Sequence, residues 1–298
     1  MSIINTNARS LRPKIDSLLD VIEETDSSIA VVIETWMQDG DNIAREVEDL
    51  SLGAGVGLLY RNREPTASNG VSYGGVAVLW RECFGSFRKL DLKNPDRFEV
   101  LVTAGSVVGH SRKTIVVACY LPPNMPLDRA EKCMCYISDV IVEVKARFNN
   151  PYLFIAGDFN QWRIEDHLAD FLDIGEAPVG PTSGQRSIDR IFLNCSKSIR
   201  ESGTLAPLKT EDSRESDHRT AYCRIEMKRK ESFKWEITIT ATTRVRQKSY
   251  LRTRLSSTTG SPSSRRREAM RRPRPTSPCS PVPSTPSFLS KRVPTCRG

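Results

Sequence analysis

The chain has 298 residues and carries 44 Lys and Arg side chains against 36 Asp and Glu, which gives a formal net charge of +8. This length can bury one large hydrophobic core, so a mini-protein that depends on disulfide staples is excluded. No stretch approaches the ~20 consecutive apolar residues of a membrane span, and the first residues lack the basic and apolar regions of a signal peptide, so we expect an intracellular protein without membrane contact.

The positive charge is concentrated at one end of the chain. Residues 1–230 contain 33 acidic and 29 basic side chains, a net charge of −4, whereas residues 231–298 contain 3 acidic and 15 basic side chains, a net charge of +12. The latter segment also holds 8 of the 18 prolines. Sequence rich in Pro, Ser and Arg with few large apolar side chains cannot offset the entropy cost of ordering. We therefore expect one folded domain over residues 1–230 and a basic, disordered tail over residues 231–298.

The apolar periodicity predicts helices alternating with strands. A helix is expected from Ser10, as its cap, through Glu24, with Pro13 in the first turn. A second helix is expected over residues 127–148, where apolar side chains recur at helical spacing. Short β-branched runs and one alternating segment predict strands at residues 29–33, 75–79, 114–118, 152–156 and 221–227. The Gly-Ala-Gly-Val-Gly string at residues 53–57 lacks a following helix pattern and is interpreted as a turn, not a nucleotide-binding loop.

The cysteine pattern indicates free thiols. The eight cysteines are scattered and lack the spacing of metal ligands or of a small disulfide framework. Cys133 and Cys135 are two positions apart on a predicted helix, so their side chains should point to different sides of it. We expect reduced cysteines and a single domain that mixes helices and strands, an α+β or α/β sandwich.

Polar side chains stand where the predicted strands end, which is the rim of a sheet where catalytic groups are usually placed. Each one alone has an ordinary explanation as a turn, cap or surface residue. Together they come from six segments: Asn5 with Asn7, Glu34, Tyr120, Asp158 with Asn160, Asp189, and Asp217 with His218. We therefore predict one polar site, with Asp217 and His218 placed just before the last strand.

The oxygen donors among these residues suit a hard divalent cation. Glu34, Asp217, Asn5 and Asn7 are ligands of the kind that Mg²⁺ prefers, with Mn²⁺ as an alternative. A metal that polarises a phosphoryl oxygen leaves the protein to activate a water and to stabilise the charged transition state. The metal set is therefore consistent with phosphoester hydrolysis.

The remaining residues of the set can perform those two tasks. Asp158 can take the proton of the water, and Asn160 can hold the water in position. His218 paired with a carboxylate such as Asp189 would have its charged form favoured, which makes it a donor to a phosphoryl oxygen.

In this order, the motifs resemble the endonuclease/exonuclease/phosphatase superfamily, and most closely the endonuclease domain of non-LTR retrotransposons. The matching strings are Asn5-Thr-Asn7-Ala-Arg-Ser-Leu-Arg-Pro-Lys14, Glu34-Thr-Trp36, Tyr73-Gly-Gly-Val-Ala-Val-Leu79, Tyr120-Leu-Pro-Pro123, Gly157-Asp-Phe-Asn160, Pro181-Thr182, Ser187-Ile-Asp-Arg-Ile-Phe192 and Ser216-Asp-His218. They span about residues 3–226. The resemblance implies a four-layer αββα sandwich of the deoxyribonuclease-I type with its active site at one end of the paired sheets.

The resemblance also implies roles for individual residues. Glu34 and Asn5 would bind the metal, with Asp217 and Asn7 beside them, and Tyr120 would touch the scissile phosphate. Asp158, Asn160, Asp189 and His218 would act as described above. Candidate nucleic-acid contacts are Arg9, Arg61, Arg63 and Thr182. The implied activity is a Mg²⁺-dependent nick in double-stranded DNA that leaves a 3′ hydroxyl and a 5′ phosphate, by a monomer that is nuclear if it acts on chromosomal DNA.

Some features depart from the family pattern and leave two alternatives open. Leu121 and Arg190 differ from the residues common at those positions, and the tail contains no reverse transcriptase domain. One alternative is another phosphodiesterase or phosphatase of the superfamily, acting on abasic DNA, RNA or inositol phosphates. The other is a non-catalytic retroelement remnant that retains the fold.

Overall fold

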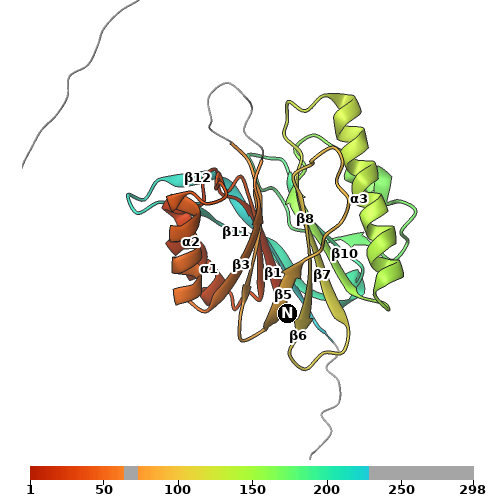
Figure 1. The fold of residues 1–298 in the computed structure, drawn as a ribbon, viewed down its shortest axis with the longest axis horizontal. Coiled ribbons are helices and arrows are strands. Elements are labelled where there is room, and N and C mark those ends of the chain that lie inside the picture. Colours follow the sequence, from red (N-terminus) through yellow and green to blue (C-terminus); the bar gives the residue numbers. More distant parts are fainter. Residues whose placement is uncertain (64–72, 228–298) are drawn as a thin grey trace, which may run out of the picture. The chain divides into compact units, whose positions relative to one another are not determined.

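The structure is a computed structural model that describes residues 1–63 and 73–227 (Figure 1). The tail expected at residues 231–298 lies outside the described residues. No helix within the described part of the chain is long and apolar enough to cross a membrane.

Two six-stranded mixed sheets form the centre of the fold. The first contains, in spatial order, β11 (Ile199–Lys209), β12 (Glu215–Ile225), β1 (Ser2–Asn7), β2 (Ile29–Ile33), β4 (Val76–Arg81) and β3 (Val56–Arg61). The second contains β5 (Gly85–Lys89), β6 (Val100–Val107), β7 (Lys113–Tyr120), β8 (Tyr152–Asp158), β10 (Asp189–Leu193) and β9 (Gly175–Glu176). One parallel pair lies inside each sheet, β1 with β2 and β7 with β8.

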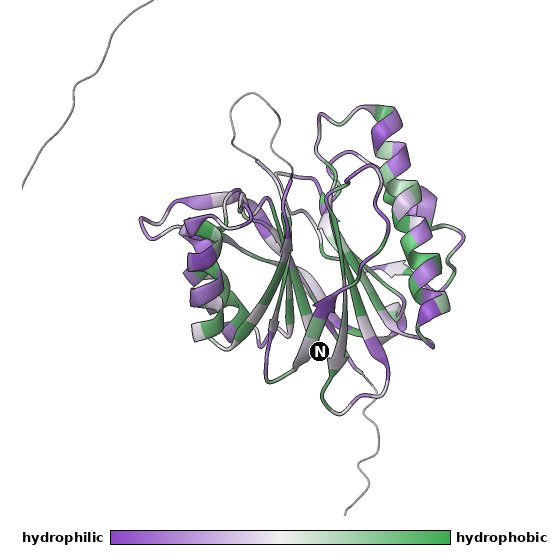
Figure 2. Ribbon diagram, in the orientation of Figure 1, coloured by the Kyte–Doolittle hydropathy of each residue, from purple (hydrophilic) through white to green (hydrophobic). Residues whose placement is uncertain are grey.

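Helices cover the outer face of each sheet (Figure 1). The helices α1 (Ile15–Glu24) and α2 (Asn42–Gly53) lie over the first sheet, and α3 (Leu127–Arg147) and α4 (Ile164–Leu168) over the second. Short 3₁₀ turns, η1 (Arg12–Lys14) and η2 (Ser196–Ser198), complete the set. The predicted four-layer αββα sandwich is thus confirmed, and buried apolar residues form the cores between its layers. The strands of both sheets are largely apolar (Figure 2).

The strands β2 and β8 are almost entirely apolar because both of their faces are buried. In β2, Val31 points into the core between the sheets, whereas Ala30 and Val32 point toward the α1 and α2 layer. In β8, Phe154 lies in the core between the sheets and Ile155 in the core beneath α3. Side chains of a strand alternate between its faces, so burial on both sides requires a continuous apolar run.

The second predicted helix is confirmed as α3, but the first begins later than expected. Ser10 does not cap it: its φ is +81° and its backbone N–H donates to the carbonyl of Glu34. Arg12–Lys14 forms the 3₁₀ turn that contains Pro13, and the α-helix begins at Ile15. The hydrogen bond to the Glu34 carbonyl therefore outweighs the local capping preference of serine.

The last strand begins earlier than the sequence indicates. β12 runs from Glu215, so Asp217 and His218 lie inside it and not before it. Ser216, His218 and Thr220 face inward, and their polarity conceals the alternation that identifies a strand. The glycine string is a turn as expected, since α2 ends at Gly53 and β3 follows a residue of positive φ, Gly55.

Candidate active site

Backbone hydrogen bonds bring the segments after β1 and β2 together. The N–H groups of Ala8, Ser10 and Leu11 donate to the carbonyls of residues 33, 34 and 35, respectively. The buried Nζ of Lys14 donates to the carbonyl of Ala8 at 2.8 Å and closes the turn. Glu34 itself has a φ of +54°, which is uncommon for a residue with a side chain and directs its carboxylate toward β1.

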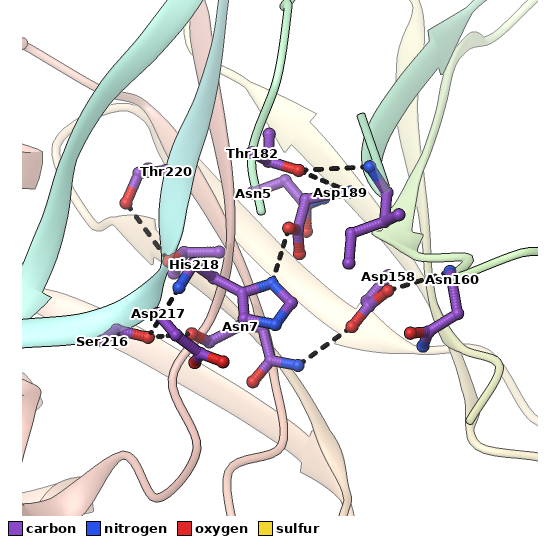
Figure 3. Close-up of polar contacts among 12 residues, drawn as sticks. Asn5, Asn7, Asp158, Asn160, Thr182, Asp189, Ser216, Asp217, His218 and Thr220 are labelled. Atoms are coloured by element: carbon purple, nitrogen blue, oxygen red, sulfur yellow. Dashed lines mark hydrogen bonds and ion pairs between the residues drawn. The ribbon is translucent and has the colours of Figure 1, made fainter. Parts of the chain in front are cut away.

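A buried ion pair joins His218 on β12 to Asp189 on β10 (Figure 3). Nδ1 of the imidazole lies 2.7 Å from Oδ2 of the carboxylate, and the two side chains are 5% and 0% exposed. Burial alone lowers the pKa of His218, but the hydrogen bond and negative charge of Asp189 outweigh it, so that pKa lies above its ordinary value. The charged imidazole is therefore favoured, and its Nδ1 proton is held by Asp189.

The Asp189 backbone is held by a threonine that we had predicted to contact nucleic acid. Oγ1 of Thr182 accepts the N–H groups of Ile188 at 3.2 Å and of Asp189 at 3.0 Å. The threonine side chain is completely buried. A buried hydroxyl that accepts two internal hydrogen bonds is not presented to a nucleic acid, so the structure reassigns Thr182 to the support of Asp189.

Asp158 ends β8 beside this pair. Its Oδ1 accepts the backbone N–H of Asn160 at 3.0 Å, and its Oδ2 accepts Nδ2 of Asn7 at 3.0 Å (Figure 3). Burial, and next the negative charge of Asp189, raise the pKa of Asp158 from 3.8 to about 7. Ligand atoms of Asp158, Asp189 and His218 all lie within 4.8 Å of one another. These three residues form a compact cluster that we call the acid–histidine cluster.

Asn7 connects this cluster to a second carboxylate. The same Nδ2 that donates to Asp158 donates to Oε1 of Glu34 at 2.8 Å, and that oxygen also accepts the hydroxyl of Tyr120 at 2.9 Å. Burial, together with the nearby Glu34 carboxylate, raises the pKa of Tyr120 above its usual range, so the phenol remains a proton donor. Oε2 of Glu34 has a longer contact, 3.3 Å to Nε1 of Trp36.

Asn5 bridges the two sheets. Nδ2 donates to the carbonyl of Gly157 at 2.9 Å and to that of Arg190 at 3.3 Å. Its Oδ1 is buried and accepts no hydrogen bond from the described residues. Position 157 must be glycine because a Cβ there would lie 1.9 Å from the carbonyl oxygen of Cys119.

Several predicted residues have contacts that differ from their expected roles. Asp217, an expected metal ligand, forms an ion pair with Arg9 at 2.9 Å, and both side chains are about half exposed, 48% and 54%. Oδ1 of Asn7 accepts the N–H of Arg9, so Asn7 presents its amide nitrogen to the carboxylates, not an oxygen ligand. Nδ2 of Asn160 donates to the carbonyl of Leu121 at 2.9 Å. Neither carboxylate that was predicted to bind the metal, Glu34 or Asp217, belongs to the acid–histidine cluster.

The sequence reasoning missed a buried carboxylate beside the site. Oε1 of Glu99 accepts Nε of Arg63 at 2.5 Å, and its Oε2 accepts the N–H of Gly75 at 2.6 Å. A Cβ at Gly74 would lie 2.5 Å from the same carboxylate, which explains the paired glycines of the motif. The guanidinium of Arg63 lies 5.4 Å from the ring centre of Tyr120. The sequence signal that could have identified Glu99 is its position as an isolated carboxylate directly before the apolar strand β6.

The donor atoms fit a hard divalent cation. Oδ1 of Asn5 and Oδ1 of Asp189 are buried acceptors that receive no hydrogen bond from the described residues. Native proteins rarely leave such acceptors unsatisfied, and oxygen atoms of carboxylates and amides are the ligands of Mg²⁺ and Ca²⁺. Glu34 adds a half-buried carboxylate with one oxygen that makes only a long hydrogen bond.

Comparison with known proteins places this geometry in a family. A model described as the Endonuclease/Exonuclease/phosphatase family matches residues 3–218. The chain belongs to this family. The matched range includes the acid–histidine cluster, Glu34 and Tyr120, and the family's name describes enzymes that cleave phosphoester bonds. No curated protein matches the chain.

Solved structures share the fold of this family member at low sequence identity. A humanized D. rerio TDP2 is 13% identical, with 76% of this chain and 99% of that chain covered and a TM-score of 0.56. The 3′ phosphatase NExo from Neisseria, bound to a product DNA hairpin, is 16% identical, with 76% and 100% covered and a TM-score of 0.55. An AP endonuclease from Archaeoglobus fulgidus is 11% identical, with 76% and 100% covered and a TM-score of 0.52.

Proposed function

We propose that the chain is a Mg²⁺-dependent DNA endonuclease of the non-LTR retrotransposon type, which nicks double-stranded DNA to leave a 3′ hydroxyl and a 5′ phosphate. The observation that carries the proposal is the connected set formed by the acid–histidine cluster, Asn7, Glu34 and Tyr120. In the proposal this set supplies a proton acceptor, a proton donor and an anionic metal ligand to one substrate.

The proton acceptor is Asp158. Its two oxygens are oriented by Asn7 and by the Asn160 N–H, so the carboxylate is held in one geometry before substrate arrives. A carboxylate with a pKa of about 7 can accept the proton of a water at neutral pH. As the water attacks phosphorus, the developing negative charge faces His218, which donates a hydrogen bond to a phosphoryl oxygen while Asp189 holds its other nitrogen.

Glu34 would hold the metal together with Oδ1 of Asn5 and Oδ1 of Asp189, the two buried oxygens that accept no hydrogen bond from the described residues. A bound divalent cation would polarise a phosphoryl oxygen and neutralise charge in the transition state. Mn²⁺ can replace Mg²⁺ at oxygen ligands of this kind. In the proposal Tyr120, whose hydroxyl donates to Glu34 in the structure, turns that hydroxyl toward the scissile phosphate.

Basic residues beside the site support a nucleic-acid substrate. A cavity of about 460 Å³ is lined by Arg61, Arg63, Lys89 and Arg97, with Asp39 as its one acidic member. Arg63 also lies against the ring of Tyr120, so the cavity adjoins the chemical site. Cationic side chains that line such a cavity can neutralise the phosphates of a DNA backbone, which contribute most of the sequence-independent affinity.

The central test is nicking of supercoiled plasmid in Mg²⁺. Asp158→Asn and His218→Ala should each lower the rate by at least about 10²-fold, the usual contribution of a positioned acid or base. Asp166→Asn, an exposed carboxylate on α4, serves as the matched control and should leave the rate unchanged. Equal nicking by all four proteins would rule out the assignment.

A substrate panel separates the proposed function from its alternatives. Intact duplex DNA, abasic DNA, RNA and inositol phosphates would be compared, and a polymerase would be used to extend the nicked product, because extension requires a 3′ hydroxyl. Faster turnover of an abasic, RNA or inositol substrate would favour another phosphoesterase of the family. No turnover of any substrate would favour a non-catalytic remnant. The retroelement origin, the nuclear location and the monomeric state are parts of the same proposal.

A further inference from the structure

A second cluster of titratable side chains lies on α3 and α4, and it shares no residue with the candidate active site. The helix α3 covers the second sheet (Figure 1). Cys135 on α3 is exposed, and its Sγ lies 3.9 Å from Nδ1 of His167 on α4. Nε2 of the same ring lies 3.1 Å from Oε2 of Glu131, one helical turn before the cysteine. Ser138 donates its hydroxyl to the backbone carbonyl of His167 at 2.9 Å, which ties α4 to α3.

The carboxylate determines which nitrogen of the neutral ring carries the proton. Glu131 can only accept, so the proton lies on Nε2 and the lone pair of Nδ1 faces the thiol of Cys135. A nucleophile within hydrogen-bond reach of a base that a third group orients is the arrangement of an activated nucleophile. Cys135, His167 and Glu131 have this arrangement.

The other described cysteines lack it. Burial raises the pKa of Cys133 and of Cys223 to about 12 and that of Cys195 to about 11, and Cys119 is also completely buried. Cys83 is exposed, but its charged neighbour is Arg81, a guanidinium that cannot accept a proton. Cys83 therefore provides an internal comparison between a thiol beside a cation and a thiol beside a base.

The thiol of Cys135 opens onto a cavity of about 400 Å³ between α3 and the segment before β6. Apolar side chains form part of its lining, among them Leu92, Phe98 and Val140. Four carboxylates line it against two lysines: Asp96, Glu131, Asp139 and Glu143 against Lys93 and Lys132. The cavity thus favours a small ligand with apolar and positively charged parts.

We propose that Cys135 is a modification site that undergoes thiol–disulfide exchange with small cationic disulfides. The proton of the thiol passes to Nδ1 of His167 as Sγ attacks one sulfur of the disulfide. A new S–S bond forms to Cys135, the original S–S bond breaks, and the departing thiolate takes the proton. One disulfide replaces another, so no further oxidant is needed.

The test is the rate at which cystamine, a dicationic disulfide, modifies each cysteine of the full chain at neutral pH. Peptide mass spectrometry with fragment-ion assignment separates Cys135 from Cys133 in their shared peptide. His167→Gln should lower the rate at Cys135 by at least about tenfold, since a positioned base is removed. Glu131→Gln, at an exposed position, should lower it by a smaller factor because the proton on Nε2 is no longer held. Neither change should alter the rate at Cys83.

The charge preference is tested with 3,3′-dithiodipropionate, a dianion of similar size. Cys135 should react faster with cystamine than with the dianion, and Cys83, beside Arg81, should not share that preference. Unchanged rates at Cys135 in both variants would overturn the proposal, as would a preference for the dianion there. Plasmid nicking by Cys135→Ser should equal that of the unchanged protein, so the outcome does not depend on the proposed nuclease function.

Discussion

At the scale of single residues, one amide group organises the centre of the site. Nδ2 of Asn7 donates to both Glu34 and Asp158, so two carboxylates that would otherwise repel each other share one donor. Asp158 is almost completely buried beside a third carboxylate, Asp189, and this environment disfavours its charged form. A site built in this way is expected to reduce the stability of the fold in exchange for chemistry.

The pH dependence of stability should reveal that cost. The pKa of Asp158 rises from 3.8 to about 7 on folding, so the folded state binds this proton more tightly and loses stability as pH rises through about 7. His218 acts in the same direction, because its raised pKa gives stability at low pH that is lost as pH rises through its folded value. At pH 8 in EDTA, the free energy of unfolding of Asp158→Asn, measured by urea denaturation, should therefore exceed that of the unchanged protein by at least about 1 kcal/mol. At pH 4 the two proteins should differ little. A variant that is less stable at pH 8 would contradict this.

Metal binding by Glu34 should be separable, at the residue scale, from the support that Asp189 gives to His218. Mg²⁺ should raise the melting temperature at pH 8, because an ion that binds only the folded state stabilises it. If Glu34 is the principal ligand, Glu34→Gln should remove most of this shift, whereas Asp189→Asn should retain part of it while still losing nicking activity. The reverse order would assign the ion to the acid–histidine cluster. The measurement is a Mg²⁺ titration of the melting temperature for each variant.

At the scale of elements, close backbone contacts position the side chains of the candidate active site. Asp158 and Tyr120 end the neighbouring parallel strands β8 and β7 and are paired in register. Gly157 permits this approach, because the carbonyl of Cys119 occupies the space that a Cβ would fill. The carbonyl of Gly157 itself accepts Nδ2 of Asn5, which reaches across from the other sheet.

A glycine substitution tests this packing. Gly157→Ala should lower the free energy of unfolding by about 3 kcal/mol or more, as overpacking against a fixed backbone does, and should also reduce nicking by displacing Asp158. Gly203→Ala on β11 is the matched control, because no heavy atom lies within 4 Å of the Cβ it would add. Urea denaturation of both variants gives the comparison. Equal destabilisation of the two variants would mean that the backbone at Gly157 relaxes without cost.

At the scale of the whole molecule, the net charge of +8 divides into −4 over residues 1–230 and +12 over residues 231–298. The carboxylates of the proposed active site belong to the acidic part, where they can hold a cation that the DNA phosphate then approaches. The basic excess is therefore a property of the tail and not evidence for the chemistry.

Removal of the tail should affect binding more than turnover. Residues 1–230 should bind DNA more weakly than the full chain at low salt, and the slope of log affinity against log salt should become shallower by about 0.9 for each DNA phosphate that the tail no longer neutralises. The rate of nicking at saturating protein should be unchanged. A shortened protein that binds DNA normally but no longer nicks it would show that the tail contributes to catalysis.

Sequence alone predicted a domain that mixes helices and strands, the α3 helix, the buried strands and most of the residues that meet at the candidate site, and the family resemblance added the four-layer arrangement. Each of these features depends on residues that are close together in the chain. A continuous apolar run predicts a buried strand, a helical repeat predicts a helix, and short motifs mark the ends of strands. The pairing of His218 with Asp189 was also proposed from residue types and is present in the structure.

Only the tertiary structure decided which atoms of these residues meet. Asn7 presents a nitrogen because Arg9 occupies its oxygen, Thr182 is turned inward to Asp189, and Asp217 pairs with Arg9. Glu99 could not be placed because its partners Arg63 and Gly75 lie in the segments after β3 and before β4, far from it in the chain. Hydrogen-bond partners depend on distances between side chains of the two sheets. The spacing of residues along the chain does not predict how those sheets pack against each other.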